Sequence, residues 1–488
     1  MGVIIKQSIN NSINIYIGII IGAINTILIF PYVFESNPEY WGLLQILVSY
    51  SVIFSTFSHL GSPNILIRYF PKILNKTHLI SFTFLLCTIG FLFFLLIFLI
   101  FHNSFLKSID ATDLLLVDNF YLVIFLVFSL SFFDLLSSLS RSYLDSSTPV
   151  FFSEVFIRVC VLLLLIFYNY NIIQFKFFLF LFIAIYLTKT LCFFYIQIKN
   201  NRFNLSFNFS KLNFKDLLEY GFYVFIAGGS SALVSRFDML MIEHYIDLKH
   251  VAYYTLAFFI GSVIKVPSRS ISFISSPLIA KYFEENDYQN VQSIYTKTSI
   301  NLLIIGGVIF LCIMLNIDDI LYLLPEKFSN GKYVVLFIGL TQLVILASGN
   351  HNVILVHSPY YKSVIYFVVF FLLLTILTNI ILIPIYGING AALATFISVL
   401  IFNTIRMLYV YKKMNFQPFS IKTFVVILMI LLIYFSVSYI PLTKITLLDI
   451  LIRSLISCTL VAFSVKYFKL SVDINSLSSK IFRKYLKF

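Results

Sequence analysis

The residues of this sequence that could do chemistry are ionisable side chains that interrupt long apolar runs. Such a side chain costs about 2.5–3.5 kcal/mol at the centre of a membrane helix, so it normally faces protein, water or a partner charge. Ten residues hold such positions, seven of them cations and three anions: Asp134, Glu154, Arg158, Lys189, Arg236, Asp238, Lys265, Arg269, Arg406 and Arg453. This excess of cations favours an anionic cargo.

The first candidate cluster consists of Arg236 and Asp238 in one apolar run and Lys265 and Arg269 in the next. Lys265 and Arg269 are one helical turn apart and share a face, and Pro267 between them should kink the helix. Arg236 and Asp238 are two residues apart, so they point to different sides of a helix. We therefore expect Asp238 to hold a cation of the neighbouring helix while Arg236 faces a cavity on a substrate or ion path. Structural ion pairing is the alternative.

Three further cations are candidates for the same path. Arg68 follows the helix-breaking stretch LGSPN, and Lys189 stands inside the apolar run 173–197. Arg158 lies four residues after Glu154, and this spacing, with the acid first, predicts an ion pair along one helix. We favour a structural pair for Arg158 and keep a role in the path as the alternative.

The other polar residues at membrane depth have interpretations that need no substrate. Asp134 could pair with Arg141, two turns later on the same helix face. Arg406 lies close to a helix end, where its long side chain can reach the membrane surface. His351 is expected to make a satisfied polar contact rather than to relay protons. The five cysteines resemble small buried residues, so we predict no disulfide, metal site or cofactor.

The composition of the chain predicts that these residues are carried by transmembrane helices. The chain has 488 residues, of which 60% are hydrophobic and only 11% are charged. Lipid must be the solvent for most of such a chain. Apolar runs of about 18–25 residues predict an all-α integral membrane protein with about fourteen transmembrane helices. The predicted spans are 13–33, 41–66, 79–101, 119–139, 150–170, 173–197, 217–242, 251–276, 294–316, 333–356, 361–383, 387–411, 422–440 and 447–469.

The basic residues favour one orientation of these spans. With the N-terminus in the cytoplasm, inward connections and termini hold about 21 lysines and arginines, against about 6 in outward connections. We expect a multi-pass membrane protein with both termini in the cytoplasm and the first span retained as a signal-anchor. The net charge is +13, but the basic residues stand singly or in small groups between apolar runs, which argues against a nucleic-acid partner.

A weak internal repeat appears when the sequence is shifted by about 210 residues. An even number of spans per half leaves both halves in the same orientation, and parallel repeats of this kind enclose a shared cavity. The predicted organisation is an N-terminal lobe (spans 1–6, residues 1–205), a C-terminal lobe (spans 7–12, residues 206–415), and spans 13–14 with a basic tail (residues 416–488).

The stretch IPIYGINGAALAT, residues 383–395, predicts a tight hairpin between spans 11 and 12. Proline ends one helix, glycines supply the turn, and alanines let the next helix approach its neighbours closely.

This stretch also resembles a recurrent motif, IP-x-YG-x-x-GAA-x-AT, of the polysaccharide-biosynthesis flippases of the multidrug/oligosaccharidyl-lipid/polysaccharide (MOP) exporter superfamily. Other segments resemble motifs of the same family: YWGLLQ (40–45), FDMLMI (237–242), VAYYTLA (251–257) and SPLIAKYFEENDYQNVQSIYTK (276–297). The resemblance covers most of the chain. Ala252 and Asn286 depart from it, since glycine is common at both positions.

The resemblance implies a flippase that moves an undecaprenyl-pyrophosphate-linked oligosaccharide, an O-antigen or capsule repeat unit, to the outer leaflet by alternating access. Its implied partners are the lipid-linked glycan, membrane lipids, and a polysaccharide polymerase with other assembly proteins. The first alternative is a cation-coupled multidrug exporter of the same superfamily, whose cavity should be acidic. The second alternative is a multi-spanning polysaccharide polymerase or ligase. Such an enzyme usually has a sizeable outward loop with catalytic residues, which this sequence lacks, so we expect no enzyme.

Overall fold

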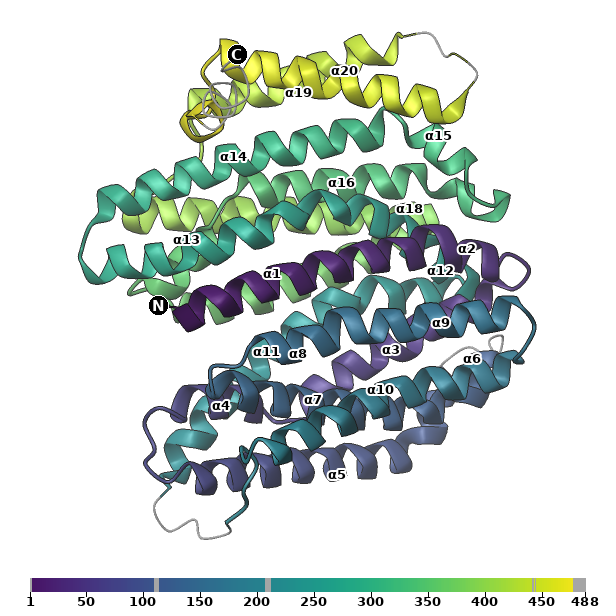
Figure 1. Ribbon diagram of the computed structural model, residues 1–488, viewed down its shortest axis with the longest axis vertical. Coiled ribbons are helices and arrows are strands. Elements are labelled where there is room, and N and C mark those ends of the chain that lie inside the picture. Colours follow the sequence, from purple (N-terminus) through teal and green to yellow (C-terminus); the bar gives the residue numbers. More distant parts are fainter. Residues whose placement is uncertain (1, 109–113, 207–211, 441–442, 444, 477–488) are drawn as a thin grey trace. The chain divides into compact units, whose positions relative to one another are not determined.

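The computed structural model of the protein describes residues 2–108, 114–206, 212–440, 443 and 445–476, and this part of the chain contains helices and no strand (Figure 1). Thirteen of the described helices are long and apolar enough to cross a membrane. The predicted all-α membrane fold is therefore confirmed. Some predicted features lie outside the described residues: Lys480, Arg483, Lys484 and Lys487 of the basic tail, and Asp110 and Asp113 of an outward loop.

The chain forms two compact units, unit 1 over residues 1–255 and unit 2 over residues 256–488. These units are defined by contacts, whereas the predicted lobes rest on a sequence repeat, so the lobe boundaries stay a prediction. Unit 1 contains α1 (Gly2–Ala23), η1 (Ile24–Ile29), α2 (Phe30–Val33), α3 (Pro38–Ser58), α4 (Ser62–Tyr69), α5 (Lys76–Ser108), α6 (Leu114–Asn119), η2 (Phe120–Leu122), α7 (Val123–Ser142), α8 (Ser147–Val150), η3 (Phe151–Phe156), α9 (Ile157–Asn169), α10 (Phe175–Lys199), α11 (Phe214–Tyr245) and the first part of α12 (Leu248–Ser262).

Helix α7 is central to unit 1, because it packs against α3, α4, α5 and α10. Its most apolar stretch is 72% buried, the largest share among the thirteen long helices. Short polar side chains allow the close approach of α10. The Ser129 hydroxyl donates to the Tyr186 carbonyl (2.6 Å) and lies 2.8 Å from the Thr190 hydroxyl. Such contacts between helices fix the register of α10 against α7.

The second predicted span breaks where LGSPN stands in the sequence. Helix α3 ends at Ser58 and α4 begins at Ser62, and between them Leu60 and Gly61 have φ angles of +50° and +72°. Glycine adopts this left-handed conformation without steric cost. Nδ1 of the buried His59 accepts a hydrogen bond from the backbone N–H of Gly61 (3.2 Å). The turn therefore holds an imidazole inside unit 1.

Unit 2 is also helical throughout its described residues, and its helices α14, α16 and α18 pack together. Helices α19 and α20 pack on each other and on α14. After the last residues of α12, unit 2 contains η4 (Val263–Lys265), α13 (Val266–Glu284), α14 (Tyr288–Met314), α15 (Ile317–Tyr322), η5 (Glu326–Gly331), α16 (Lys332–Ala347), α17 (His351–His357), α18 (Ser363–Met414), α19 (Ile421–Ser438) and α20 (Thr446–Tyr467).

The 52-residue helix α18 is two spans that fold back at Gly387, where φ is +60° and ψ is −137°. The Thr378 and Ser398 hydroxyls lie 2.8 Å apart, although a straight helix would separate them by about 30 Å. A Cβ on Gly390 would collide with the carbonyl of Leu382, so glycine is required where the two arms meet. The predicted hairpin is confirmed, and the two arms correspond to the predicted spans 361–383 and 387–411.

Candidate functional site

Lys189 is a buried cation of unit 1, since only 2% of this α10 residue is exposed. Its Nζ lies 3.7 Å from the ring centroid of Phe133 on α7 and 5.6 Å from that of Tyr186. Among the described residues, no carboxylate lies within 4 Å of this ammonium group. Aromatic faces stabilise a cation without neutralising it. Lys189 therefore keeps a charge that could attract an anion.

Asp134 of α7 is an exposed carboxylate within unit 1, and we infer that it faces an opening. Its side chain is exposed, although the adjacent α7 residues Phe133 and Leu135 are buried. His59 of the α3–α4 turn and Lys189 of α10 lie within electrostatic range of its carboxylate. A side chain that is exposed yet flanked by two other elements faces a gap between helices. Because a charge at this depth needs water or a counter-ion, we interpret the opening as hydrated.

The predicted pair of Asp134 with Arg141 does not form. Arg141 donates from Nε to the carbonyl of Ser137 on its own helix (3.2 Å). His59, Lys189 and Arg141 all lie within electrostatic range of the Asp134 carboxylate, but among the described residues none of them forms an ion pair with it within 4 Å.

Three predicted site cations of unit 1 share one neighbour, Tyr186 of α10. Arg158 and Arg236 both lie within electrostatic range of its hydroxyl, and the Lys189 ammonium lies near its ring. These cations come from α9, α10 and α11. We call Arg158, Lys189 and Arg236 the Tyr186 cation group.

Arg158 pairs with Glu154, with Nη1 2.7 Å from Oε2, so the predicted ion pair is confirmed. Both side chains remain partly exposed, by 31% and 24%. Helix α1 passes directly beside the pair, since a Cβ on Gly18 would lie 2.6 Å from Nη1 of Arg158. Asn25 of the following segment η1 donates a hydrogen bond from Nδ2 to the Arg158 carbonyl (2.9 Å). The sequence analysis missed Gly18 and Gly22, although GIIIG has the small-xxx-small pattern of closely packed membrane helices.

Two other predicted residues of unit 1 make specific contacts. Asp238 is buried on α11 and accepts a hydrogen bond from the Tyr254 hydroxyl (2.9 Å). The guanidinium carbon of the exposed Arg68 lies 4.1 Å from the ring centroid of Tyr220. Arg68 is thus stacked on α11.

Lys265 and Arg269 belong to unit 2, where both are exposed and lie within electrostatic range of each other. Lys265 ends the single 3₁₀ turn η4 between α12 and α13, and Pro267 stands in the first turn of α13. The α-helical pattern is thus interrupted by a 3₁₀ turn just before Pro267, and the kink expected at Pro267 stays a prediction. The predicted grouping of these cations with Arg236 and Asp238 would join the two units and stays a prediction.

Arg406 in unit 2 is only 5% exposed, so the expectation that it reaches the membrane surface is wrong. Its Nη2 donates to Oδ1 of Asn352, and its guanidinium carbon lies 5.3 Å and 5.9 Å from the ring centroids of Phe402 and Phe367. The neighbouring His351 lies 3.1 Å from a backbone carbonyl of its own turn, which confirms the satisfied polar contact predicted for it.

Metal chemistry finds no support among the residues that the structure describes, since no three His, Cys, Asp or Glu side chains there are grouped to hold an ion. All five cysteines are free thiols, and Sγ of Cys312 lies 3.8 Å from Sγ of Cys458.

Two family models match the sequence. The model described as polysaccharide biosynthesis protein matches residues 8–283, which is more than half of the chain, and the model described as MatE matches residues 226–381. No curated protein matches the sequence.

The fold is similar to those of solved transporters. The lipid II flippase MurJ in an inward-closed conformation is 16% identical, with a TM-score of 0.75 over 94% of this chain and 98% of that one. An inward-facing multidrug resistance MATE family transporter of the MOP superfamily is 13% identical, with a TM-score of 0.61 over 84% and 98%. A MOP superfamily transporter from Pyrococcus furiosus is 13% identical, with a TM-score of 0.59 over 84% and 96%. At such low identity these similarities show the fold alone.

Proposed function

This chain belongs to the polysaccharide biosynthesis protein family of the MOP exporter superfamily, and we propose that it flips an undecaprenyl-pyrophosphate-linked oligosaccharide across the membrane. The chain is a multi-pass membrane transporter of that superfamily. The proposed cargo is a repeat unit of O-antigen or capsule, moved from the cytoplasmic to the outer leaflet by alternating access. We assign the chain transport and no enzymatic reaction.

The observation that carries this proposal is the Tyr186 cation group, whose Lys189 lies within electrostatic range of the exposed Asp134. A pyrophosphate that leaves water needs fixed cations and hydrogen-bond donors in its place. Arg158, Lys189 and Arg236 supply three cations from three helices of one unit, and only Arg158 of these has a carboxylate partner within 4 Å among the described residues. Unit 1 can therefore receive a diphosphate without first breaking three ion pairs.

A multidrug exporter is the second candidate, and the MatE model over residues 226–381 favours it. Such a protein would carry cationic amphiphiles, which need acidic side chains in the path. In unit 1 the carboxylate of Glu154 is already paired, and Asp134 lies near Lys189. This charge arrangement favours the anionic cargo.

The proposed setting is the bacterial cytoplasmic membrane, with both termini in the cytoplasm as the basic residues indicate. The proposed partners are the lipid-linked glycan, the surrounding lipids, and the polymerase and other assembly proteins that use the flipped glycan. Neither nucleic acid nor a soluble cofactor has a role in this account.

The test is leaflet transfer by the purified full-length protein in liposomes. One sample contains undecaprenyl-pyrophosphate with a fluorescent oligosaccharide, and a matched sample contains a fluorescent lipophilic cation. We expect protein-dependent transfer of the glycan lipid and none of the cation. Transfer of the cation alone would overturn the proposal and favour the exporter, and lengthening of the glycan would indicate a polymerase.

A further inference from the structure

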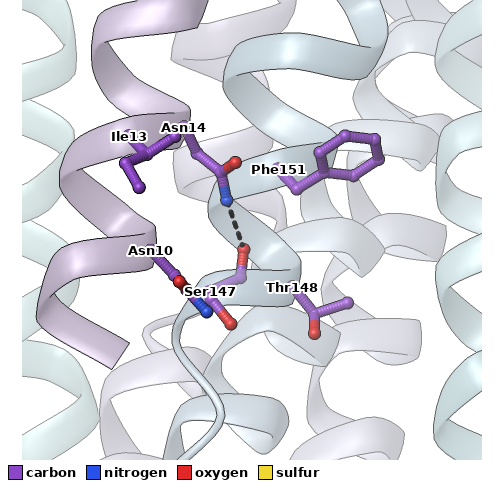
Figure 2. A pocket seen from close by; sticks show the side chains of 6 residues that line it. All are labelled: Asn10, Ile13, Asn14, Ser147, Thr148 and Phe151. Carbon is purple, nitrogen blue, oxygen red and sulfur yellow. Dashed lines mark hydrogen bonds between the residues drawn. The ribbon is translucent and has the colours of Figure 1, made fainter. Parts of the chain in front are cut away.

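A polar cavity lies between α1 and the start of the α8–η3–α9 segment, within unit 1. Its volume is about 290 Å³. Figure 2 shows Asn10 and Asn14 extending from α1 toward Ser147. Among the residues that the structure describes, its lining includes no charged side chain: Asn10, Ile13, Asn14, Ser147, Thr148 and Phe151.

The walls of this cavity are held by hydrogen bonds between the two segments. Oε1 of Gln7 accepts from the backbone N–H groups of Ser146 (3.2 Å) and Ser147 (2.9 Å). Nδ2 of Asn11 donates to the Ser146 hydroxyl (2.8 Å), and Nδ2 of Asn14 lies 3.4 Å from the Ser147 carbonyl. These bonds fix the lining groups before any ligand arrives, which lowers the cost of binding.

Several lining groups keep unused hydrogen-bonding capacity. Among the described residues, the Asn10 side chain and the Ser147 hydroxyl make no hydrogen bond, and Asn14 uses only its amide nitrogen. The Thr148 hydroxyl donates to Asp145 (2.9 Å) and can still accept. The cavity therefore offers both donors and acceptors, all of them neutral. The ring of Phe151, which is 41% exposed, adds an apolar surface.

The nearest described carboxylate is engaged elsewhere. Asp145 bonds to Arg202 (2.8 Å). Partial burial acts to raise the pKa of Asp145, but hydrogen bonds from Arg202 and Thr148 outweigh it and keep the pKa below its ordinary value. Asp145 thus stays ionised at neutral pH and neutralises Arg202, so neither group supplies a spare charge to the cavity.

We propose that this cavity is a binding site for a neutral sugar ring, and that it recognises a sugar of the lipid-linked glycan. This inference rests on the proposed function for the source of the sugar. Each sugar hydroxyl both donates and accepts, which matches amide and hydroxyl groups held in place, while the C–H face of the ring matches an aromatic side chain. A phosphate would instead need cations or several donors, and the lining residues offer no cation. The two proposed sites bind different parts of the cargo: the polar cavity beside α1 binds a sugar, and the Tyr186 cation group binds the diphosphate.

The test measures saturation-transfer NMR signals from methyl glycosides of neutral hexoses and N-acetylhexosamines, added to the full-length protein in phosphatidylcholine nanodiscs. We expect ring-proton signals from at least one glycoside. Asn10→Ala and Ser147→Ala should each weaken its affinity by about two- to tenfold. Asn64→Ala is the matched control, because Asn64 is an exposed asparagine of α4 outside the cavity.

Leaflet transfer of the glycan lipid, measured on the same variants, separates failure of this site from failure of the proposed function. We expect the cavity variants to need more glycan lipid for half-maximal transfer while their maximal rate stays unchanged. Normal transfer by the wild type, with sugar signals equal in all variants or absent, would overturn the sugar site and leave the flippase standing. Cavity-dependent sugar signals without transfer would keep the sugar site and overturn the flippase. Loss of the signals on adding glycerophosphocholine would assign the cavity to a lipid headgroup and overturn the sugar site.

Discussion

Lys189 in unit 1 and Arg406 in unit 2 are both buried cations without a carboxylate within 4 Å among the described residues, but their surroundings differ. Arg406 donates to Asn352 and lies near two phenylalanine rings. Lys189 contacts aromatic rings alone and lies near the exposed Asp134.

This difference separates a structural cation from a cation available to cargo. A guanidinium that is hydrogen-bonded and lies near two aromatic rings links α17 to α18, so its loss should cost stability. The Lys189 ammonium group has no hydrogen-bond partner among the described residues and lies near the opening inferred at Asp134, so we expect it to contribute less to folding and more to binding an anion during transport.

Lys189→Gln should lower the rate of glycan-lipid transfer by about ten- to a hundredfold, the value of one charge-assisted hydrogen bond in the transition state. Its melting temperature should stay within about two degrees of the wild type, because no ion pair is broken. The measurements are leaflet transfer and fluorescence-detected melting of the purified protein. Lys281→Gln, which changes an exposed lysine, is the control and should transfer normally.

Arg406→Met should behave in the opposite way. It removes the charge-assisted hydrogen bond to Oδ1 of Asn352 and the contacts of the guanidinium with Phe402 and Phe367, and we expect a loss of about 2 kcal/mol of stability. The melting temperature should fall by several degrees, while transfer per folded molecule stays unchanged. A variant as stable as the wild type but inactive would place Arg406 in the transport path and remove the contrast.

Gly18→Ala tests how tightly α1 packs on the Arg158–Glu154 pair. The added Cβ would lie 2.6 Å from Nη1 of Arg158 and 2.7 Å from the Glu154 carbonyl, so we expect a loss of about 1–2 kcal/mol. Gly228→Ala is the matched control, because its Cβ would meet its nearest neighbour at an ordinary 3.4 Å. Equal melting temperatures for the two variants would show that α1 does not press on the pair.

The smallest expected effect is a pH dependence of the Asp145–Arg202 pair. Because the native pKa of Asp145 is lowered, its contribution to stability is present above the ordinary aspartate pKa of about 4 and is lost as pH falls through the native value. The melting temperature of Arg202→Gln should therefore fall less than that of the wild type on going from neutral pH to pH 3. Parallel curves for the two proteins would show that the pair contributes nothing.

Local patterns in the sequence predicted the parts of the site that depend on one helix or one turn. Glu154 and Arg158 are neighbours on any helix, and the proline and glycines of IPIYGINGAALAT favour a hairpin wherever it lies. The error at Arg406 has a different origin. Its partner Asn352 stands 54 residues earlier, and no helix periodicity connects them.

The neighbours of Asp134 show the same limit. Arg141 is close in sequence, but it donates to its own helix, while Lys189 comes near only because Ser129 and Thr190 set α10 against α7. The number of cations within the apolar runs can be predicted from the sequence alone. Which of them are sealed and which adjoin an opening depends on contacts between helices that one sequence does not reveal.

The most direct test is the chemical accessibility of position 134 to a water-soluble, membrane-impermeant thiol reagent. The five native cysteines are replaced by serine or alanine, and Asp134→Cys is compared with Ser398→Cys, a position of unit 2 that is 0% exposed. We predict rapid labelling at position 134, slowed by pyrophosphate-linked glycan, and no labelling at position 398. Equally slow labelling at both positions in a folded protein would show that unit 1 holds no hydrated opening beside Lys189, and would contradict the account.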